Sequence, residues 1–229
     1  MNQSPYLLSE NDRQFLQNIF SDSKKATAAK HMMESFSELM AYYRCAIMEI
    51  ETKFNVLNEE FSLQYDRNPI NGIKSRLKRI ESIAQKLSRN EKPLTLDSIE
   101  ENLNDVAGVR VICSFTHDVY MLADAFLSRD DVTLISKKDY IKDPKANGYR
   151  SLHLIVSIPI FLLHEKRSMK VEIQLRTIAM DSWAALEHQL KYKKSAEFTD
   201  EMASDLFLCS QLSAELDKRM DNLRKTVNI

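Results

Sequence analysis

The chain has 229 residues, of which 44% are hydrophobic and 28% charged, so it is long enough to bury a core and lacks the composition of a disordered protein. Its formal net charge of −1 argues against a general nucleic-acid-binding protein, because such proteins are basic overall. The longest apolar run, LIVSIPIFLL, is too short to span a bilayer, which argues against a membrane segment.

The first predicted element is a long helix over residues 30–64. Apolar side chains recur there at alternating spacings of four and three, the pattern of a heptad repeat. This apolar seam consists of Phe36, Met40, Tyr43, Ile47, Ile50, Phe54, Leu57 and Phe61. Because it is too large to leave in water, we expect a helix over residues 202–223 to cover part of it and another subunit to cover the rest.

A basic stretch follows, with seven lysines and arginines against two acidic residues between Lys74 and Lys92. An extended segment carrying Arg76 and Lys78 leads into a short helix that stops before Pro93. Such a charge run usually marks a solvated helix face. Because neither GxxxxGK[ST] nor GxGxxG occurs, any polyphosphate would be held by these side chains and not by a glycine-rich loop.

The central part of the chain alternates helices and strands. The segment DSIEENL predicts a helix with Asp97 as N-cap and Glu100 completing a capping box. GVRVICSF and VTLIS predict two strands separated by a helix, and SLHLIVSIPI and MKVEIQLRT predict a hairpin. The second hairpin strand alternates apolar and polar residues, so one face is expected in the core while Glu172, Gln174 and Arg176 share the other.

These elements predict an α/β (α+β) fold in which a mixed β-sheet of about five strands is flanked by helices. Two helices, over TIAMDSWAALEHQLKYKK and over residues 202–223, complete the chain. We expect an N-terminal helical region over residues 1–65, a central domain over 66–193 and a C-terminal packing helix over 194–229.

The cysteines and the first residues bear on the cellular location. Cys45, Cys113 and Cys209 do not have the spacing of a metal site, which favours reduced thiols, with Cys113 in the core. The segment MNQSPYLLSENDR lacks the basic and apolar regions of a signal peptide. We therefore expect a cytoplasmic protein.

Two carboxylates are candidates for a functional site. Asp105 precedes the predicted strand GVRVIC, and Glu172 lies in the middle of another strand, where a desolvated carboxylate needs a partner. Glu172 could form an ion pair with Arg110 or Arg176. It could equally bind Mg²⁺, which typically takes one or two carboxylates together with substrate phosphates. The residues alone leave both possibilities open.

Five segments, KSRLKRIESIAQKL, DVAGVRVIC, ANGYRSLH, VEIQLRT and SWAALEHQLKYK, resemble in order and spacing the RelA/SpoT synthetase domain, the family that makes the alarmones ppGpp and pppGpp. The resemblance covers residues 66–193 and implies a small stand-alone synthetase with a nucleotidyltransferase-like fold and no hydrolase domain. It implies transfer of the β,γ-pyrophosphate of ATP to the 3′-hydroxyl of GDP or GTP, with release of AMP and with Mg²⁺ as cofactor.

The resemblance also assigns residues. It implies that Asp105 and Glu172 bind Mg²⁺ and that Glu172 accepts the 3′-hydroxyl proton. The implied ATP-binding residues are Arg76, Lys78, Ser82, Lys86, Arg89, Arg110 and Lys138, the last standing where many members have arginine. The implied GDP- or GTP-binding residues are Lys145, Asn147, Tyr149, Arg150, His153, Gln174 and Glu187, with Tyr149 stacking on guanine.

Partners and alternatives complete the expectations. Family members of this size are typically homotetramers, so a tetramer is expected, without membrane or nucleic-acid partners. A nucleotide sensor without catalysis is disfavoured because Asp105, Glu172 and Tyr149 are all present. An interaction protein that uses the long helix, or a pyrophosphokinase or nucleotidyltransferase with another acceptor, are further alternatives. The sequence does not rank GDP, GTP and GMP as acceptors.

Overall fold

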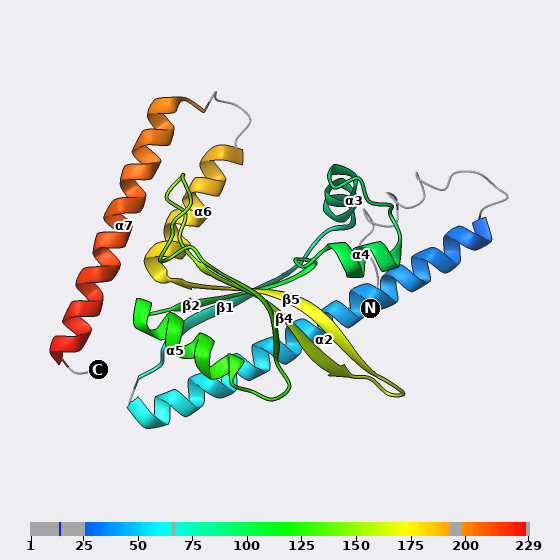
Figure 1. Ribbon diagram of the computed structural model, residues 1–229, viewed down its shortest axis with the longest axis horizontal. Helices are drawn as coiled ribbons and strands as arrows, with labels where there is room; N and C mark the ends of the chain where they lie inside the picture. The colour runs from blue at the N-terminus through cyan, green and yellow to red at the C-terminus, as the bar shows by residue number, and fades with distance from the viewer. Residues whose placement is uncertain (1–13, 15–25, 66, 193–197, 228–229) are drawn as a thin grey trace, which may run out of the picture. The chain divides into compact units, whose positions relative to one another are not determined.

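The computed structural model describes residues 14, 26–65, 67–192 and 198–227 (Figure 1). In chain order, its elements are α2 (Ala26–Tyr65), β1 (Ile70–Leu77), α3 (Ile80–Arg89), α4 (Leu96–Asn102), β2 (Ala107–Cys113), α5 (Thr116–Leu127), β3 (Thr133–Asp139), β4 (Leu152–Phe161), β5 (Lys166–Thr177), α6 (Ile178–Tyr192) and α7 (Asp200–Val227). The strands form a five-stranded mixed sheet in the order β1-β2-β5-β4-β3, which confirms the predicted fold class. None of the described helices combines the length and the hydropathy needed to cross a membrane.

The chain divides into two compact units. Unit 1 combines the described part of Met1–Glu49 with Ser75–Gly108 and Ser157–Glu172, and unit 2 combines Ile50–Lys74, Val109–Val156 and Ile173–Ile229. The predicted division at residues 65 and 193 stays a prediction. Most of residues 1–25, including the segment examined for a signal peptide, and residues 193–197 lie outside the described residues.

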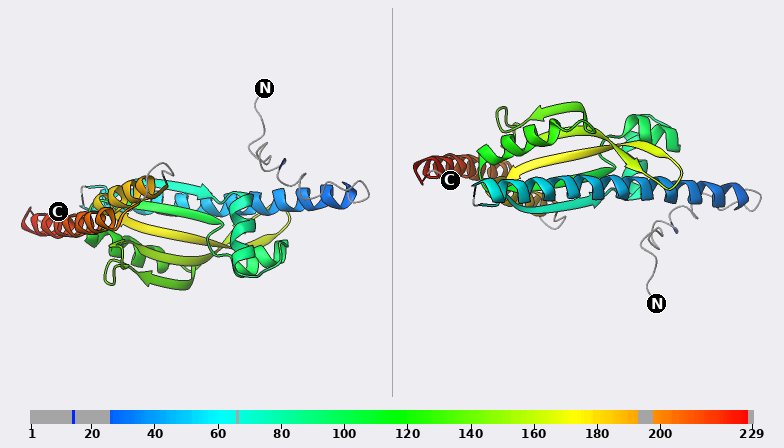
Figure 2. Two further views of the ribbon diagram at one scale, coloured as in Figure 1. Left: turned by 90° about the horizontal axis from the view of Figure 1, so that it is seen from above. Right: turned by 90° about the horizontal axis from the view of Figure 1, so that it is seen from below.

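Helix α2 confirms the predicted long helix and is drawn as one uninterrupted helix in both views of Figure 2. The seam residues Phe36, Met40, Tyr43, Ile47, Ile50, Phe54 and Leu57 are all buried within the single chain, and only Phe61 is half-buried. The expectation that another subunit covers the rest of this seam is therefore wrong. The helix expected over residues 202–223 does not bury its apolar side chains either, since Leu212, Leu216 and Leu223 are largely exposed. The heptad spacing identified the buried face of α2 correctly, but a repeat cannot tell whether the covering residues belong to the same chain.

In unit 1, the short helices α3 and α4 pack against each other (Figure 2). The predicted N-cap of α4 is wrong: Thr95, not Asp97, has the extended backbone of a cap, and its hydroxyl accepts a hydrogen bond from the Ser98 amide. Glu100 does not close a capping box with Asp97, and its carboxylate binds Arg167 at 2.7 Å. A threonine two residues upstream competes for the same role, and the sequence does not indicate which one wins.

In unit 2, helices pack through apolar rings and through one indole. Phe54 of α2 stacks on Phe126 of α5, with ring centroids 4.7 Å apart. Helices α6 and α7 lie side by side (Figure 1), and the indole N–H of Trp183 in α6 donates to the carbonyl of Leu206 in α7 at 2.8 Å. Cys113 of β2 is fully buried, as predicted, and all three cysteines are free.

The strands position the polar residues. Along β4 and β5, buried residues alternate with partly exposed ones, so the predicted hairpin with one core face is confirmed. Arg176 is an exception, because its side chain is buried although it lies in the polar register. The sequence predicts only an extended segment around Arg76, where the structure has the edge strand β1. Its residues do not alternate regularly between buried and exposed, so it lacks the pattern that predicts a strand.

Candidate active site

In unit 1, one carboxylate gathers the basic residues that follow β1. Asp105 lies in the loop between α4 and β2, and its Oδ2 atom binds the ammonium groups of Lys78 and Lys86, the latter at 2.8 Å. A backbone bond from the Lys78 amide to the Val106 carbonyl, 2.8 Å long, holds the two segments together. The predicted basic surface and the predicted acidic residue therefore meet.

Charge and burial act against each other at this carboxylate. Burial alone would raise the pKa of Asp105, but the bonds from Lys78 and Lys86 outweigh it and hold that pKa below its ordinary value. Burial lowers the pKa of Lys78, and its bond to Asp105 partly offsets this change. Arg76 also acts on Lys78 electrostatically and lies 3.9 Å from Glu172 of β5. These five residues, Arg76, Lys78, Lys86, Asp105 and Glu172, form the Asp105 cluster.

The second oxygen of Asp105 differs from the first, because it bonds to neither lysine. Its Oδ1 atom is buried and has no hydrogen-bond partner among the described residues. Buried polar atoms are rarely left unpaired, so this oxygen is free to bind a cation. The donor set suits Mg²⁺, since two carboxylates of one unit supply hard oxygen ligands. The described residues contain no group of three or more histidine, cysteine, aspartate or glutamate side chains that could hold a metal ion.

The other predicted ATP residues have different placements. Ser82 and Arg89 are exposed on α3, within one helical turn of Lys86, and extend the same basic side of the helix. Lys138 is exposed on β3 in unit 2. Arg110 also belongs to unit 2, where it joins a separate network.

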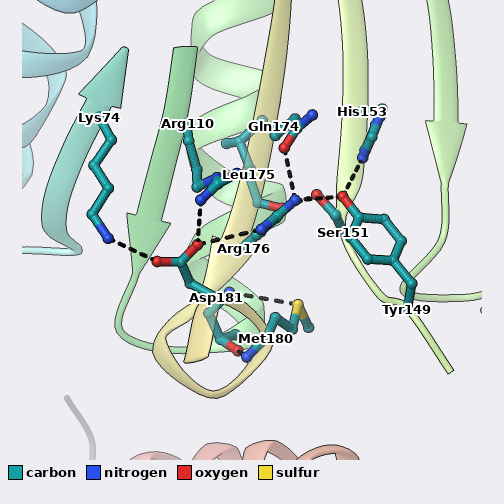
Figure 3. A network of polar contacts seen from close by, with 11 residues as sticks. Lys74, Arg110, Tyr149, Ser151, His153, Gln174, Leu175, Arg176, Met180 and Asp181 are labelled. Carbon is teal, nitrogen blue, oxygen red and sulfur yellow. Dashed lines mark hydrogen bonds and ion pairs between the residues drawn. The ribbon is translucent and has the colours of Figure 1, made fainter. Parts of the chain in front are cut away.

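In unit 2, a single aspartate organises a network that the sequence did not reveal (Figure 3). Asp181, in the first turn of α6, accepts from Arg110 at 3.0 Å and from Arg176 at 3.3 Å through Oδ1, and from Lys74 at 3.0 Å through Oδ2. Arg176 in turn donates to the side-chain oxygen of Gln174 and to the hydroxyl of Tyr149. His153 shares that hydroxyl through Nε2 at 2.8 Å.

The network brings three of the predicted acceptor residues together: Tyr149, His153 and Gln174. It adds Lys74, Arg176 and Asp181, and together with Arg110 these residues form the Asp181 network. Burial alone would raise the pKa of Asp181, but Lys74, Arg110 and Arg176 outweigh it and hold that pKa below its ordinary value. Burial also lowers the pKa of Arg110. An acidic residue in the first turn of a helix usually only complements the helix dipole, so its position gave no signal of this role.

The ring of Tyr149 lies among cations and aromatic edges. The ammonium of Lys145 is 4.9 Å from its centroid, and the guanidinium carbon of Arg176 is 5.1 Å from it. Tyr140 and His153 meet each other and the Tyr149 ring edge-on. The hydroxyl bonds fix the ring at one end, while Lys145 is exposed and belongs to the adjoining loop.

That loop, residues 144–150, is the Tyr149 loop. Gly148 has a φ of +85°, a conformation that favours glycine, and its amide donates to the Lys145 carbonyl at 2.7 Å. Asn147 accepts from the Tyr149 amide and donates to Glu187 of α6 at 3.2 Å. Arg150 is directed elsewhere and binds Asp217 of α7 at 2.6 Å. Of the predicted acceptor residues, Asn147 and Glu187 therefore meet, whereas Arg150 is bound to another helix.

Comparison with known proteins decides the family. Residues 75–197 match the region found in RelA / SpoT proteins. The chain belongs to this family. The resemblance of the five segments is thereby confirmed.

Individual relatives agree with the family match. The chain is 39% identical over 199 residues to GTP pyrophosphokinase YwaC of Bacillus subtilis, a match that covers 87% of this chain and 95% of that protein. The structure of small alarmone synthetase 1 from Bacillus subtilis bound to its product pppGpp superposes with a TM-score of 0.77 at 32% identity, covering 86% of this chain and all of that one. The same synthetase bound to AMPCPP gives a TM-score of 0.72 at 29% identity, covering 85% of this chain and 98% of that one.

Proposed function

We propose that this chain is a GTP pyrophosphokinase that transfers the β,γ-pyrophosphate of ATP to the 3′-hydroxyl of GDP or GTP, forming ppGpp or pppGpp and AMP. Its relatives carry that activity in their names, and one related structure holds the product pppGpp. The observation that carries the proposal is the Asp105 cluster, where a half-buried carboxylate, with one oxygen unpaired in the described part of the chain, lies in a group of lysines and an arginine.

The Asp105 cluster suits the donor nucleotide. ATP brings three linked phosphates, and Arg76, Lys78 and Lys86 supply positive charge without a glycine-rich loop. Asp105 and Glu172 would hold Mg²⁺, which offsets phosphate charge when it is bound. Because Oδ2 of Asp105 already binds both lysines, its Oδ1 atom would be the one available to the ion.

The transfer itself needs one proton acceptor. The 3′-hydroxyl oxygen of the acceptor forms a bond to the β-phosphorus of ATP, and the bond from that phosphorus to the α–β bridging oxygen breaks, so AMP leaves. Glu172 accepts the hydroxyl proton, as a carboxylate base does in other phosphoryl transfers. The pyrophosphate carries its negative charge through the reaction, which is why cationic side chains are needed throughout.

The Asp181 network suits the acceptor nucleotide. Tyr149 offers a ring for stacking on guanine, and the bonds from Arg176 and His153 hold that ring in one orientation before the base binds. Lys145 lies at the ring now and would have to shift, which its exposed position on the loop allows. Gln174 and Asn147 add polar groups for the base edge or ribose.

A direct assay tests the proposal. We expect the purified chain, given ATP labelled in its γ-phosphate and either GDP or GTP, to form labelled ppGpp or pppGpp that separates by thin-layer chromatography. Removing divalent cations with a chelator should stop the reaction, and adding Mg²⁺ should restore it. Comparing the rates with GDP, GTP and GMP in the same assay ranks them as acceptors. Failure to label any guanine nucleotide in the presence of Mg²⁺ would rule out this function, and labelling of another acceptor alone would point to a different pyrophosphokinase.

We further propose a homo-oligomer, expected to be a tetramer, that assembles through α6 and α7. Large apolar side chains are exposed there, in contrast to the buried seam of α2: Ile178, Leu186, Leu190, Met202, Phe207, Leu208, Leu212, Leu216, Met220, Leu223 and Val227. Changing Leu212 and Leu223 together to glutamate should lower the mass measured by light scattering. A wild-type monomer at micromolar concentration would contradict the assembly. The free cysteines fit a cytoplasmic location, which we also propose.

A further inference from the structure

The Tyr149 loop is fastened to α7 by a buried ion pair. Arg150 donates to Asp217 at 2.6 Å and to the hydroxyl of Ser213 at 3.2 Å. Both charged side chains are nearly excluded from solvent, with 9% and 8% of their surface exposed. Arg150 directly follows Tyr149 in the chain, so a fixed guanidinium limits where the tyrosine backbone can go.

A second contact lies two residues earlier. The backbone at Gly148 is so close to α7 that a Cβ atom there would lie 2.0 Å from Oγ of Ser210 and 3.3 Å from the Phe207 ring. Real Cβ atoms essentially never come as close as the Ser210 distance, and the positive φ of Gly148 disfavours any other residue. The loop backbone therefore rests directly on α7 at this point.

The ion pair between Arg150 and Asp217 is not accounted for by a contribution to stability. Burial raises the pKa of Asp217, and the opposing effects of Thr177 and Arg150 do not cancel that change. A raised pKa means that the ionised carboxylate is less favourable in the folded chain than in the unfolded one at neutral pH. Buried ion pairs often contribute little net stability, and fixing one geometry is their better-supported role.

We propose that α7 is a positioning element of the acceptor site, in which Asp217 acts through Arg150 to hold the Tyr149 loop in the conformation that presents Tyr149 to guanine. The role of the loop in acceptor binding rests on the proposed function. Asp217 is accordingly a positioning residue and contacts no substrate. Arg150, which the family resemblance assigns to the nucleotide, serves the loop through α7.

Steady-state kinetics separate this role from general support of the fold. Asp217→Ala should raise the KM for GDP about ten-fold or more while the KM for ATP changes less than about two-fold, because only the acceptor loop loses its fastening. Asp217→Asn keeps a hydrogen-bond acceptor and should raise the GDP value only about three-fold. Glu215→Ala is the matched control: it removes a carboxylate two residues away on α7 whose partner is the exposed Arg219, and both constants should stay unchanged.

Hydrogen–deuterium exchange gives a readout that does not depend on activity. The amides of Lys145 and Gly148 are bonded within the loop, so they should exchange faster in Asp217→Ala while the amides of β4 and β5 keep their wild-type rates. Unchanged loop protection would overturn the proposal.

Kinetics can overturn it as well. An equal rise of both KM values, or a loss of kcat alone, would mean that α7 only supports the fold. If Asp217→Ala does not fold, the Asp217→Asn variant decides, and an unchanged GDP KM in that variant counts against the proposal. If the wild-type chain makes no product, the proposed function is wrong. The exchange experiment still decides whether α7 holds the Tyr149 loop, because it does not depend on activity.

Discussion

The two units each contain an aspartate that collects cations, and the two differ in how far their carboxylates are satisfied. Asp181 uses both oxygens, on two arginines and one lysine. Asp105 uses one oxygen on two lysines and leaves the other unpaired among the described residues. A fully bonded carboxylate fixes its neighbours, whereas a half-bonded one retains capacity for a ligand. We therefore expect Asp181 to matter for structure and binding and Asp105 to matter for chemistry.

The largest effect is expected at Glu172, which lies in the same unit as Asp105. Glu172→Gln keeps the shape of the side chain but removes its negative charge, and with it the proton acceptor. We expect kcat to fall roughly 1,000-fold at saturating ATP and GDP, with an unchanged melting temperature. Glu165→Gln, at an exposed position of the same hairpin, is the control and should behave as wild type. Near-normal turnover by Glu172→Gln with Mg²⁺ would remove Glu172 from the chemistry.

Asp105→Asn tests the half-bonded carboxylate directly. Without its charge, the Oδ1 position binds Mg²⁺ poorly, so kcat should fall about 100-fold and the Mg²⁺ concentration for half-maximal activity should rise. Titrating Mg²⁺ at fixed nucleotide concentrations measures both. Recovery of full activity simply by adding ATP would show that Asp105 binds the nucleotide and not the metal ion.

Tyr149→Ala tests the proposed acceptor site in unit 2, which contains the Asp181 network. Losing a stacking surface typically costs 1–3 kcal/mol, so the KM for GDP should rise roughly ten-fold or more while the ATP value stays nearly constant. Tyr149→Phe keeps the ring and removes only the hydroxyl held by Arg176 and His153, and its effect should be much smaller. A change in the ATP constant instead would mean that the loop belongs to the other nucleotide.

The smallest catalytic effect is expected at the fully bonded aspartate. Asp181→Asn leaves the buried Arg176 without its ionic partner, so the free energy of unfolding should fall by about 2 kcal/mol. The KM for GDP should rise only a few-fold, because the network loosens but no group that contacts the reacting atoms is removed. Denaturant unfolding monitored by circular dichroism measures the first change. If Asp181→Asn were stable but as inactive as Asp105→Asn, the contrast between the two aspartates would fail.

The sequence predicts those features that depend on a repeating pattern. The period of α2 and the alternation along β5 identified the buried residues, since burial of apolar surface dominates both elements. The capping pattern pointed to Asp97, whereas Thr95 is the helix cap, because either side chain can serve. Patterns also did not show that the chain covers its own seam, which depends on packing between distant segments.

In the candidate site, too, the sequence predicted some residues, whereas contacts between distant segments became visible only in the structure. The five segments placed Asp105, Glu172 and Tyr149 in a functional context, and the structure supplied their neighbours. Asp181 escaped notice because its partners come from three other segments of the chain. The resemblance of ANGYRSLH assigns Arg150 to a nucleotide, which stays a prediction; the structure adds that its guanidinium binds Asp217, a contact that a position in a motif does not reveal.

Trp183 makes the contact between α6 and α7 observable. It is the single tryptophan of the chain, its indole bonds to Leu206, and it lines a cavity of about 260 Å³ together with Asn147 and Glu187. Indole fluorescence shifts to the red when water reaches the ring, and no other residue contributes that emission. Trp183 is therefore an intrinsic fluorophore next to the Tyr149 loop. Rapid-mixing fluorescence could follow movement of α7 during a single turnover without any label.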